Sequence, residues 1–205
     1  MTTLDELAAV GVLPVVVLDD AADAVPLGRA LAAGGVTCAE ITLRTAAGVD
    51  AIATLAADGF LVGAGTVLDA AQLSASADAG AVFVVNPGWN ADLVAGARAR
   101  GLLPVPGVAT ASEVMTALAA GVDTLKLFPA AQLGGPGMIA ALHGPFPNVR
   151  FVPSGGIGID EAPGYAIDPV LSVSTSWIAP RQMIREHRFD EITERARAFR
   201  AALGR

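Results

Sequence analysis

Short apolar runs alternate with longer amphipathic segments along nearly the whole chain, and this alternation constrains the fold more than any other feature. The runs are rich in Val, Leu and Ile and mostly lack polar residues at every second position, which is typical of strands buried on both faces. They cover residues 12–18, 36–43, 60–67, 81–86, 102–106, 122–128, 149–153 and 170–173. Helices are expected between and after them, at 20–33, 46–57, 69–79, 91–100, 112–120, 135–142, 159–167 and 189–203.

Eight strand-like runs alternating with eight connecting segments favour a parallel sheet, either closed or open and doubly wound. Leu18, Asp19 and Asp20 follow the first run, where a nucleotide-binding open sheet usually carries its Gly-rich fingerprint. We therefore predict an α/β fold of the (β/α)8 TIM-barrel type, with one compact domain over residues 1–205 and a short helix over residues 1–10. Glycines are expected to end four helices in the left-handed conformation, at positions Gly34, Gly80, Gly101 and Gly121.

Composition argues against several classes of function. The chain carries 20 acidic and 13 basic residues, a formal net charge of −7, and no basic cluster, so neither nucleic acid nor an anionic membrane is an expected partner. Cys38 is the only cysteine and the two histidines lie far apart, so we predict no metal site. The first residues lack the basic region of a signal peptide and the apolar runs are too short to span a membrane, so we expect a cytoplasmic protein.

Polar residues gather at the carboxyl ends of the predicted strands, where barrel enzymes place their catalytic groups. Side chains alternate along a strand, so Glu40, Thr42 and Arg44 share one face and should point into the barrel. A buried structural Glu–Arg pair is the alternative to a catalytic role, but three polar groups at the rim exceed what packing needs. Cys38 lies deeper on the same face, where we expect it to fill the core.

The chain contains twelve arginines and a single lysine, Lys126, which lies on the sixth apolar run. The same alternation turns Thr124, Lys126 and Phe128 inward. Burial of an amine, and a cation such as Arg44 across the interior, both favour the neutral form, which attacks ketones and forms Schiff bases. A salt bridge between Lys126 and Glu40 without any chemistry is the alternative, and spacing alone does not separate the two.

Three residues after the seventh run, Ser154, Gly155 and Gly156, have the pattern of a backbone anion cradle, and barrels often bind phosphate at this position. Phe128 and Trp177 are expected to be pocket walls. The histidines are expected to be structural at His143 and solvated at His187.

Together these residues resemble a known family, the 2-keto-3-deoxy-6-phosphogluconate/4-hydroxy-2-oxoglutarate aldolases, which are class I, Schiff-base lyases. The matching stretches follow the family's order and cover nearly the whole chain. They are residues 14–17, 40–45, 62–67, 86–88, 106–108, 126–130, 144–146 and 151–157.

The resemblance implies that Lys126 forms the Schiff base with the ketone of a keto-acid and that Glu40 shuttles protons. It implies a carbon–carbon lyase that needs neither a metal nor a cofactor. Such an enzyme binds a small keto-acid, releases pyruvate and acts in carbohydrate metabolism of the Entner–Doudoroff type. The resemblance also implies a homotrimer. The substrate-binding residues it implies are Arg44 and Thr66 for the carboxylate, Pro87 and Phe128 as walls, and Ser154, Gly155, Gly156 and Ser176 at the phosphate end.

The chain departs from the family pattern in two places. Ser154 stands where the family commonly has threonine, and Ser174 and Thr175 stand where it usually has two glycines. Side chains there could block a phosphate from the backbone amides or could offer hydroxyl donors. We therefore predict retained aldolase chemistry with an altered or relaxed preference for the aldehyde portion. The alternatives are a phosphate-binding barrel isomerase or epimerase, and a non-catalytic small keto-acid-binding protein.

Overall fold

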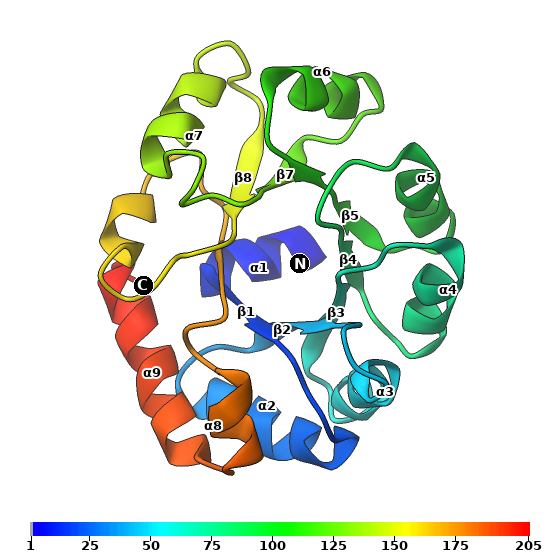
Figure 1. The fold of residues 1–205 in the computed structure, drawn as a ribbon, viewed down its shortest axis with the longest axis vertical. Coiled ribbons are helices and arrows are strands. Elements are labelled where there is room, and N and C mark those ends of the chain that lie inside the picture. The colour runs from blue at the N-terminus through cyan, green and yellow to red at the C-terminus, as the bar shows by residue number, and fades with distance from the viewer. Residues whose placement is uncertain (1) are drawn as a thin grey trace.

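The strands of the computed structural model, which describes residues 2–205, curl about a common centre with most of the helices outside them (Figure 1). Six strands form one parallel sheet in the order β5-β4-β3-β2-β1-β9, and three form a second parallel sheet in the order β6-β7-β8. The strands are β1 (Val12–Val16), β2 (Cys38–Thr42), β3 (Leu61–Gly65), β4 (Phe83–Val85), β5 (Leu103–Val105), β6 (Gly107–Val108), β7 (Thr124–Leu127), β8 (Arg150–Pro153) and β9 (Val173–Thr175).

Backbone hydrogen bonds are also made by residues beside the strands at the two places where the sheets adjoin. Pro106, the last residue of the predicted run 102–106, separates β5 from β6, and its carbonyl accepts a hydrogen bond from the Lys126 amide at 2.9 Å. At the other junction, Phe151 of β8 bridges Val170, and the Leu171 amide donates to the Phe151 carbonyl at 2.9 Å. The eighth predicted strand, 170–173, was therefore only partly right, because Val173 alone of this run belongs to β9 and Val170 forms an isolated bridge ahead of it.

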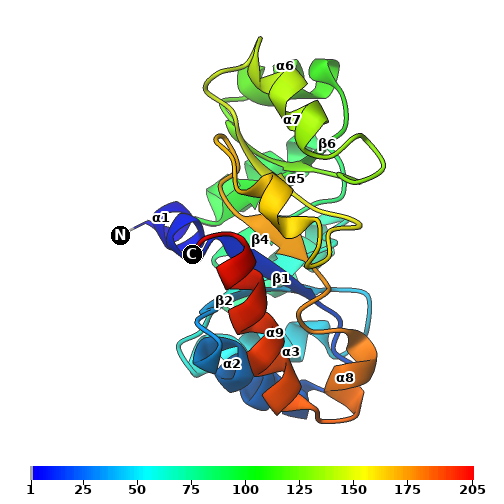
Figure 2. The same ribbon diagram turned by 90° about the vertical axis from the view of Figure 1, so that its left-hand side faces the viewer.

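The predicted N-terminal helix is confirmed as α1 (Thr3–Val10). Thr2 and Asp5 form a capping box at its start, and Gly11 ends it with φ 73°. Figure 2 shows α1 on the side of the fold that carries both chain termini, behind the strands as viewed in Figure 1. Its buried residues Leu7 and Val10 join the single apolar cluster that fills the protein.

The connecting helices match the predictions except near the C-terminus. The segment 159–167 forms only a 3-10 turn, η2 (Ala162–Tyr165), which contains Pro163 and Gly164, both poor helix residues. A five-residue helix, α8 (Arg181–Arg185), was not predicted because it is too short to show helical periodicity. The others are η1 (Ala21–Asp23), α2 (Ala24–Ala33), α3 (Gly48–Ala57), α4 (Ala70–Asp78), α5 (Ala91–Ala99), α6 (Ala111–Ala119), α7 (Pro136–His143) and α9 (Phe189–Ala202).

Three of the four predicted left-handed glycines are confirmed, at Gly80, Gly101 and Gly121. The prediction for Gly34 was wrong, because Gly34 has φ −84° and the next residue, Gly35, takes φ 83°. Gly34 is instead a site of close packing between α2 and α9. A Cβ atom there would lie 2.5 Å from the Cβ of Ala196 and 2.7 Å from the carbonyl oxygen of Thr193.

Among residues 2–205, no helix combines the length and the apolar character needed to cross a membrane.

Candidate active site

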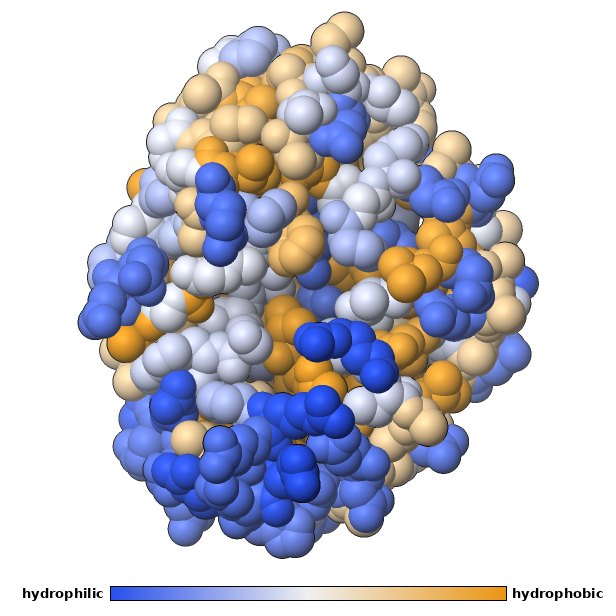
Figure 3. Space-filling model, viewed as in Figure 1, coloured by the Kyte–Doolittle hydropathy of each residue, from blue (hydrophilic) through white to orange (hydrophobic). Residues whose placement is uncertain are grey.

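A cavity of about 570 Å³ lies at the carboxyl ends of the strands. Figure 3 shows this face of the molecule hollowed near its centre, with a strongly hydrophilic region below it over α8. All ten predicted site residues line the cavity: Glu40, Arg44, Thr66, Pro87, Lys126, Phe128, Ser154, Gly155, Gly156 and Ser176. The other lining residues are Val15, Val17, Thr42, Ile157, Gly158, Ser174, Thr175 and Trp177.

The lysine and the glutamate predicted from strand alternation meet inside this cavity. The Nζ atom of Lys126 on β7 lies 3.4 Å from the Oε1 atom of Glu40 on β2, and the two side chains are 8% and 1% exposed. The Oε2 atom of Glu40 is buried and has no hydrogen-bond partner among the described residues. One carboxylate oxygen therefore contacts the amine while the other is free to accept a proton from a bound molecule.

A glycine on the neighbouring strand makes room for the Glu40 side chain, which the sequence analysis missed. Gly65 pairs with Thr42 in the β2–β3 register, and a Cβ atom on it would lie 2.5 Å from Cγ and 2.7 Å from Cδ of Glu40. Any side chain at position 65 would therefore displace the carboxylate from Lys126.

Arg44 and Thr66 bring a cation and a strained backbone to the rim. Arg44 is exposed, and its guanidinium has no ion pair or hydrogen bond within residues 2–205. Thr66 follows β3 directly and has φ 59°, a conformation that is a genuine outlier for a β-branched residue. Such strain costs on the order of 1–3 kcal/mol and clusters at functional sites. The rim of the cavity thus carries the unpaired Arg44 guanidinium and the strained backbone of Thr66.

Two aromatic rings form walls of the cavity, as predicted. The Nζ atom of Lys126 lies 5.5 Å from the centroid of the Phe128 ring, a cation–π distance. The Trp177 ring stacks with the Arg195 guanidinium at 3.8 Å, and Nε of Arg195 donates a hydrogen bond to the Trp177 carbonyl at 2.8 Å. Arg195 on α9 therefore holds Trp177 in place, a role that the sequence did not reveal.

Glycines shape the wall that follows β8. Gly155 and Gly156 have φ 98° and 74°, where residues with a Cβ are disfavoured. A Cβ on Gly155 would lie 3.2 Å from the Phe128 ring. The backbone is thus exposed to the cavity, but one backbone amide of this wall already donates a hydrogen bond within the protein. Gly158 donates its N–H to Oε2 of Glu161 at 2.9 Å.

Ser174 and Thr175 on β9, the two residues at the positions of the family's usual glycines, differ in their hydrogen bonds. Thr175 donates its hydroxyl to the Ile157 carbonyl at 2.6 Å and accepts from the Trp177 amide at 3.0 Å. Ser174 is fully buried, and its Oγ has no hydrogen-bond partner among the described residues. Of these two residues, only Ser174 therefore has a hydroxyl that makes no hydrogen bond within the described chain.

The remaining reactive residues lie outside the cavity. Cys38 is fully buried, donates its Sγ–H to the Val12 carbonyl at 3.3 Å, and fills the core as predicted. Burial raises the pKa of its thiol to about 12, so it is not a nucleophile near neutral pH. His187 is exposed, as predicted, and lies 3.2 Å from Asp23. In the described range, His, Cys, Asp and Glu side chains form no cluster of three or more that could hold a metal ion.

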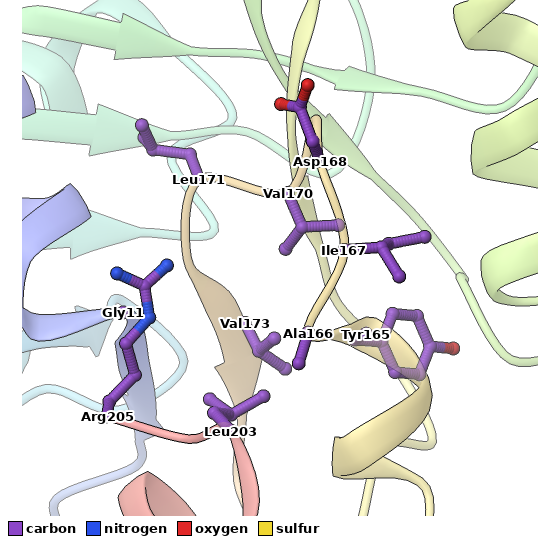
Figure 4. Close-up of a pocket in the computed structure, with 10 residues that line it drawn as sticks. All are labelled: Gly11, Tyr165, Ala166, Ile167, Asp168, Val170, Leu171, Val173, Leu203 and Arg205. Atoms are coloured by element: carbon purple, nitrogen blue, oxygen red, sulfur yellow. The ribbon is translucent and has the colours of Figure 1, made fainter.

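A second cavity, of about 270 Å³, lies near the start of β1 and the C-terminus (Figure 4). Its ionisable residues do not converge. In Figure 4 the Asp168 carboxylate and the Arg205 guanidinium lie well apart, and the Tyr165 hydroxyl points away from both. This cavity lacks the paired acid–base groups of the first one and is not the candidate active site.

Comparison with known proteins gives a consistent result along the chain. The model of the family described as KDPG and KHG aldolase matches residues 4–195. A 2-dehydro-3-deoxy-phosphogluconate aldolase of Treponema pallidum is 43% identical over 196 residues, which cover 94% of this chain and 93% of that protein. The KHG/KDPG aldolase of Escherichia coli is 40% identical over 201 residues, covering 96% and 94%.

Solved structures agree with these relatives. The KDPG aldolase of Legionella pneumophila, with pyruvate captured at low pH as a covalent carbinolamine intermediate, superposes with a TM-score of 0.91 at 38% identity over 97% of this chain and 98% of that one. The 2-keto-3-deoxy-6-phosphogluconate aldolase of Zymomonas mobilis with 3-phosphoglycerate gives 0.88 at 39% identity over 97% and 95%. The chain therefore belongs to the KDPG and KHG aldolase family.

Proposed function

We propose that the chain is a class I aldolase that cleaves a 2-keto-3-deoxy sugar acid of the phosphogluconate type, or 4-hydroxy-2-oxoglutarate, to pyruvate and an aldehyde. The observation that carries this proposal is the buried Lys126 amine 3.4 Å from the Glu40 carboxylate in the cavity. The carbinolamine captured in the Legionella pneumophila relative supports it, because a carbinolamine is the product of an amine adding to a ketone.

In the first step the neutral amine of Lys126 attacks the ketone carbon of the substrate. Glu40 gives the carbonyl oxygen a proton that it took from the Lys126 ammonium, and takes a second proton from the attached nitrogen, which yields the neutral carbinolamine. It then gives this second proton to the carbinolamine hydroxyl, which leaves as water, and the nitrogen lone pair forms the C=N bond of a protonated imine. The distance of 3.4 Å between Nζ of Lys126 and Oε1 of Glu40 allows this transfer directly or through one water molecule.

In the second step the protonated imine acts as an electron sink. Glu40 takes the proton of the C4 hydroxyl, the C3–C4 bond breaks, and its electrons form the C2–C3 double bond of an enamine while the aldehyde leaves. Protonation of C3 and addition of water to the imine then release pyruvate and restore the Lys126 amine. The unpaired Oε2 of Glu40 is the acceptor that this step needs.

The surrounding residues orient the pyruvate half of the substrate. Arg44 carries an unpaired guanidinium that would bind the carboxylate with charge-assisted hydrogen bonds, and Thr66 lies on the same rim. Phe128 and Pro87 wall the reacting carbon and limit access of water. Ser154, Gly155, Gly156 and Ser176 would contact the far end of the substrate.

We further propose that the preference for a phosphorylated substrate is relaxed. Thr175 donates its hydroxyl to Ile157 and caps the Trp177 amide, so neither donor is free for a phosphate. The Gly158 amide is held by the Glu161 carboxylate, whose charge would repel a phosphate nearby. A strong kinetic preference for the phosphorylated keto-acid over its unphosphorylated counterpart would contradict this part of the proposal.

At the level of architecture, we propose that the two sheets close into one (β/α)8 barrel forming a single domain over residues 1–205. The support is the set of hydrogen bonds at both junctions, donated by the Lys126 and Leu171 amides. If these bonds close the barrel, both amides should exchange with deuterium as slowly as those of the central strands.

We also propose a homotrimer, which the family resemblance implies, and a location in the cytoplasm, which was the expectation from the sequence. Light scattering on the purified protein tests the trimer, and cell fractionation tests the location.

The experiment that tests the proposed reaction is a panel of keto-acids in a pyruvate-release assay. The wild type should release pyruvate from at least one 2-keto-3-deoxy acid, and Lys126→Arg should abolish release because a guanidinium is too basic to act as a nucleophile. An isomerase or epimerase, or a binding protein, would release no pyruvate from any member. Appreciable activity in Lys126→Arg would refute the role of the lysine.

A further inference from the structure

Ser174 carries a buried hydroxyl that the fold itself does not use. The residue is 0% exposed, its Oγ has no hydrogen-bond partner in the described chain, and it lines the active-site cavity. Leaving a buried hydroxyl unpaired is unfavourable because the group loses its hydrogen bonds to water, so native structures rarely retain one without a reason. A group on a bound molecule would supply the missing partner.

A second serine lies beside it on the neighbouring strand. Ser154 forms a parallel bridge with Ser174, so the two side chains point to the same face, and Ser154 also lines the cavity. Val152 pairs with Lys126, and Ser154 comes two residues later, about 6–7 Å further along the strand towards the rim. Measured along β8, the serine pair therefore lies one side-chain layer beyond Lys126, next to the glycines that are proposed to contact the far end of the substrate.

The nearby hydroxyls show that this arrangement is particular to Ser174. Thr175 is committed to Ile157 and Trp177. Ser172 also has an unpartnered Oγ, but it does not line the cavity. The wall formed by residues 154–158 and 174–177 contains no lysine or arginine, so its side chains suit a neutral polar group.

We propose that Ser174, with Ser154 beside it, forms a subsite for a hydroxyl group on the aldehyde portion of the substrate. A serine hydroxyl both donates and accepts a hydrogen bond, which matches an alcohol. The subsite makes Ser174 a specificity-determining residue that favours polyhydroxylated aldehydes over apolar ones of the same length. This inference rests on the proposed aldolase function and names the substrate class of the same site.

The test runs the reaction in the condensation direction, with saturating pyruvate and either glyceraldehyde or propanal. These aldehydes share a three-carbon chain, and only glyceraldehyde has hydroxyls beyond the reacting carbonyl. The ratio of kcat/KM for the two should fall about tenfold in Ser174→Ala relative to wild type, since one lost hydrogen bond is worth about 1.4 kcal/mol. Comparing ratios removes the intrinsic difference in reactivity between the aldehydes.

Ser172→Ala is the matched control, because it removes another buried unpaired hydroxyl two residues away, outside the cavity. Its ratio should equal that of the wild type. An unchanged ratio in Ser174→Ala, or an equal fall in Ser172→Ala, would overturn the subsite. Should Ser174→Ala not fold, Ser174→Gly tests the same hydroxyl with the residue that the family usually carries. Failure of the wild type to form a borohydride-stable adduct with pyruvate would instead refute the aldolase function.

Discussion

Adding one methyl group at Gly65 should slow the enzyme about 100-fold although neither proposed catalytic residue is replaced. In Gly65→Ala the new Cβ would lie 2.5 Å from Cγ of Glu40. Carbon atoms pack at about 3.5–4.0 Å, so Cγ must move by at least about 1 Å. Rotating the carboxylate alone does not relieve a clash at Cγ, and the whole side chain must change its rotamer.

The displacement breaks the alignment of Glu40 with Lys126. A misplacement of about 1 Å costs on the order of 100-fold in rate, or about 2.7 kcal/mol of transition-state stabilisation. We therefore expect kcat for pyruvate release to fall about 100-fold in Gly65→Ala, through loss of proton transfer by Glu40.

Steady-state kinetics of pyruvate release measure this effect, and circular dichroism with thermal unfolding checks that the variant is folded. Gly137→Ala is the control, because a Cβ there meets no atom within 4 Å and the site lies in α7, away from the cavity. Its kcat should equal that of the wild type. A folded Gly65→Ala enzyme with wild-type kcat would refute the claim that the Glu40 position matters for catalysis.

Three further predictions concern Glu40, the core thiol and the packing of α9. Glu40→Gln keeps the size of the side chain but removes its basicity, so kcat should fall by about 10²–10⁴-fold in the pyruvate-release assay, and wild-type turnover would exclude Glu40 as the proton carrier. Burial raises the pKa of Cys38 to about 12, so the thiol stays protonated at pH 8. Iodoacetamide should label it in urea but not in the native protein, and rapid native labelling would contradict the burial. Gly34→Ala forces a Cβ to within 2.5 Å of Ala196 and should lower the free energy of unfolding by about 1–3 kcal/mol in urea titration, whereas an unchanged midpoint would show that α2 and α9 separate easily.

Strand alternation is what made much of the site predictable from the sequence. A strand exposes every second side chain to the same face, so the positions of Glu40, Arg44, Lys126 and Phe128 on their runs were enough to turn them inward, and all four line the cavity. Family resemblance supplied the residues that alternation cannot place, such as Thr66 and Pro87, which follow the strands in loops.

The parts that escaped prediction depend on contacts between distant segments. The clearance at Gly65 depends on the rotamer of Glu40 on another strand, and the contact between Trp177 and Arg195 joins the loop after β9 to α9. Val15 and Val17 line the cavity as ordinary apolar residues and carry no chemical signal. The composition of segment 159–167 suggested a helix, but the segment contains Pro163 and forms only a 3-10 turn.

The most direct test of the central claim is to locate a trapped pyruvate adduct on the chain. Protein incubated with pyruvate and reduced with borohydride is digested with trypsin, which cleaves after lysine and arginine. Lys126 is the only cleavage site between Arg100 and Arg150, and a reduced imine on it blocks cleavage. Schiff-base catalysis predicts that peptides 101–126 and 127–150 are replaced by one peptide, 101–150, carrying the mass of one reduced pyruvate. Unmodified peptides 101–126 and 127–150 in the presence of pyruvate and borohydride would contradict the account.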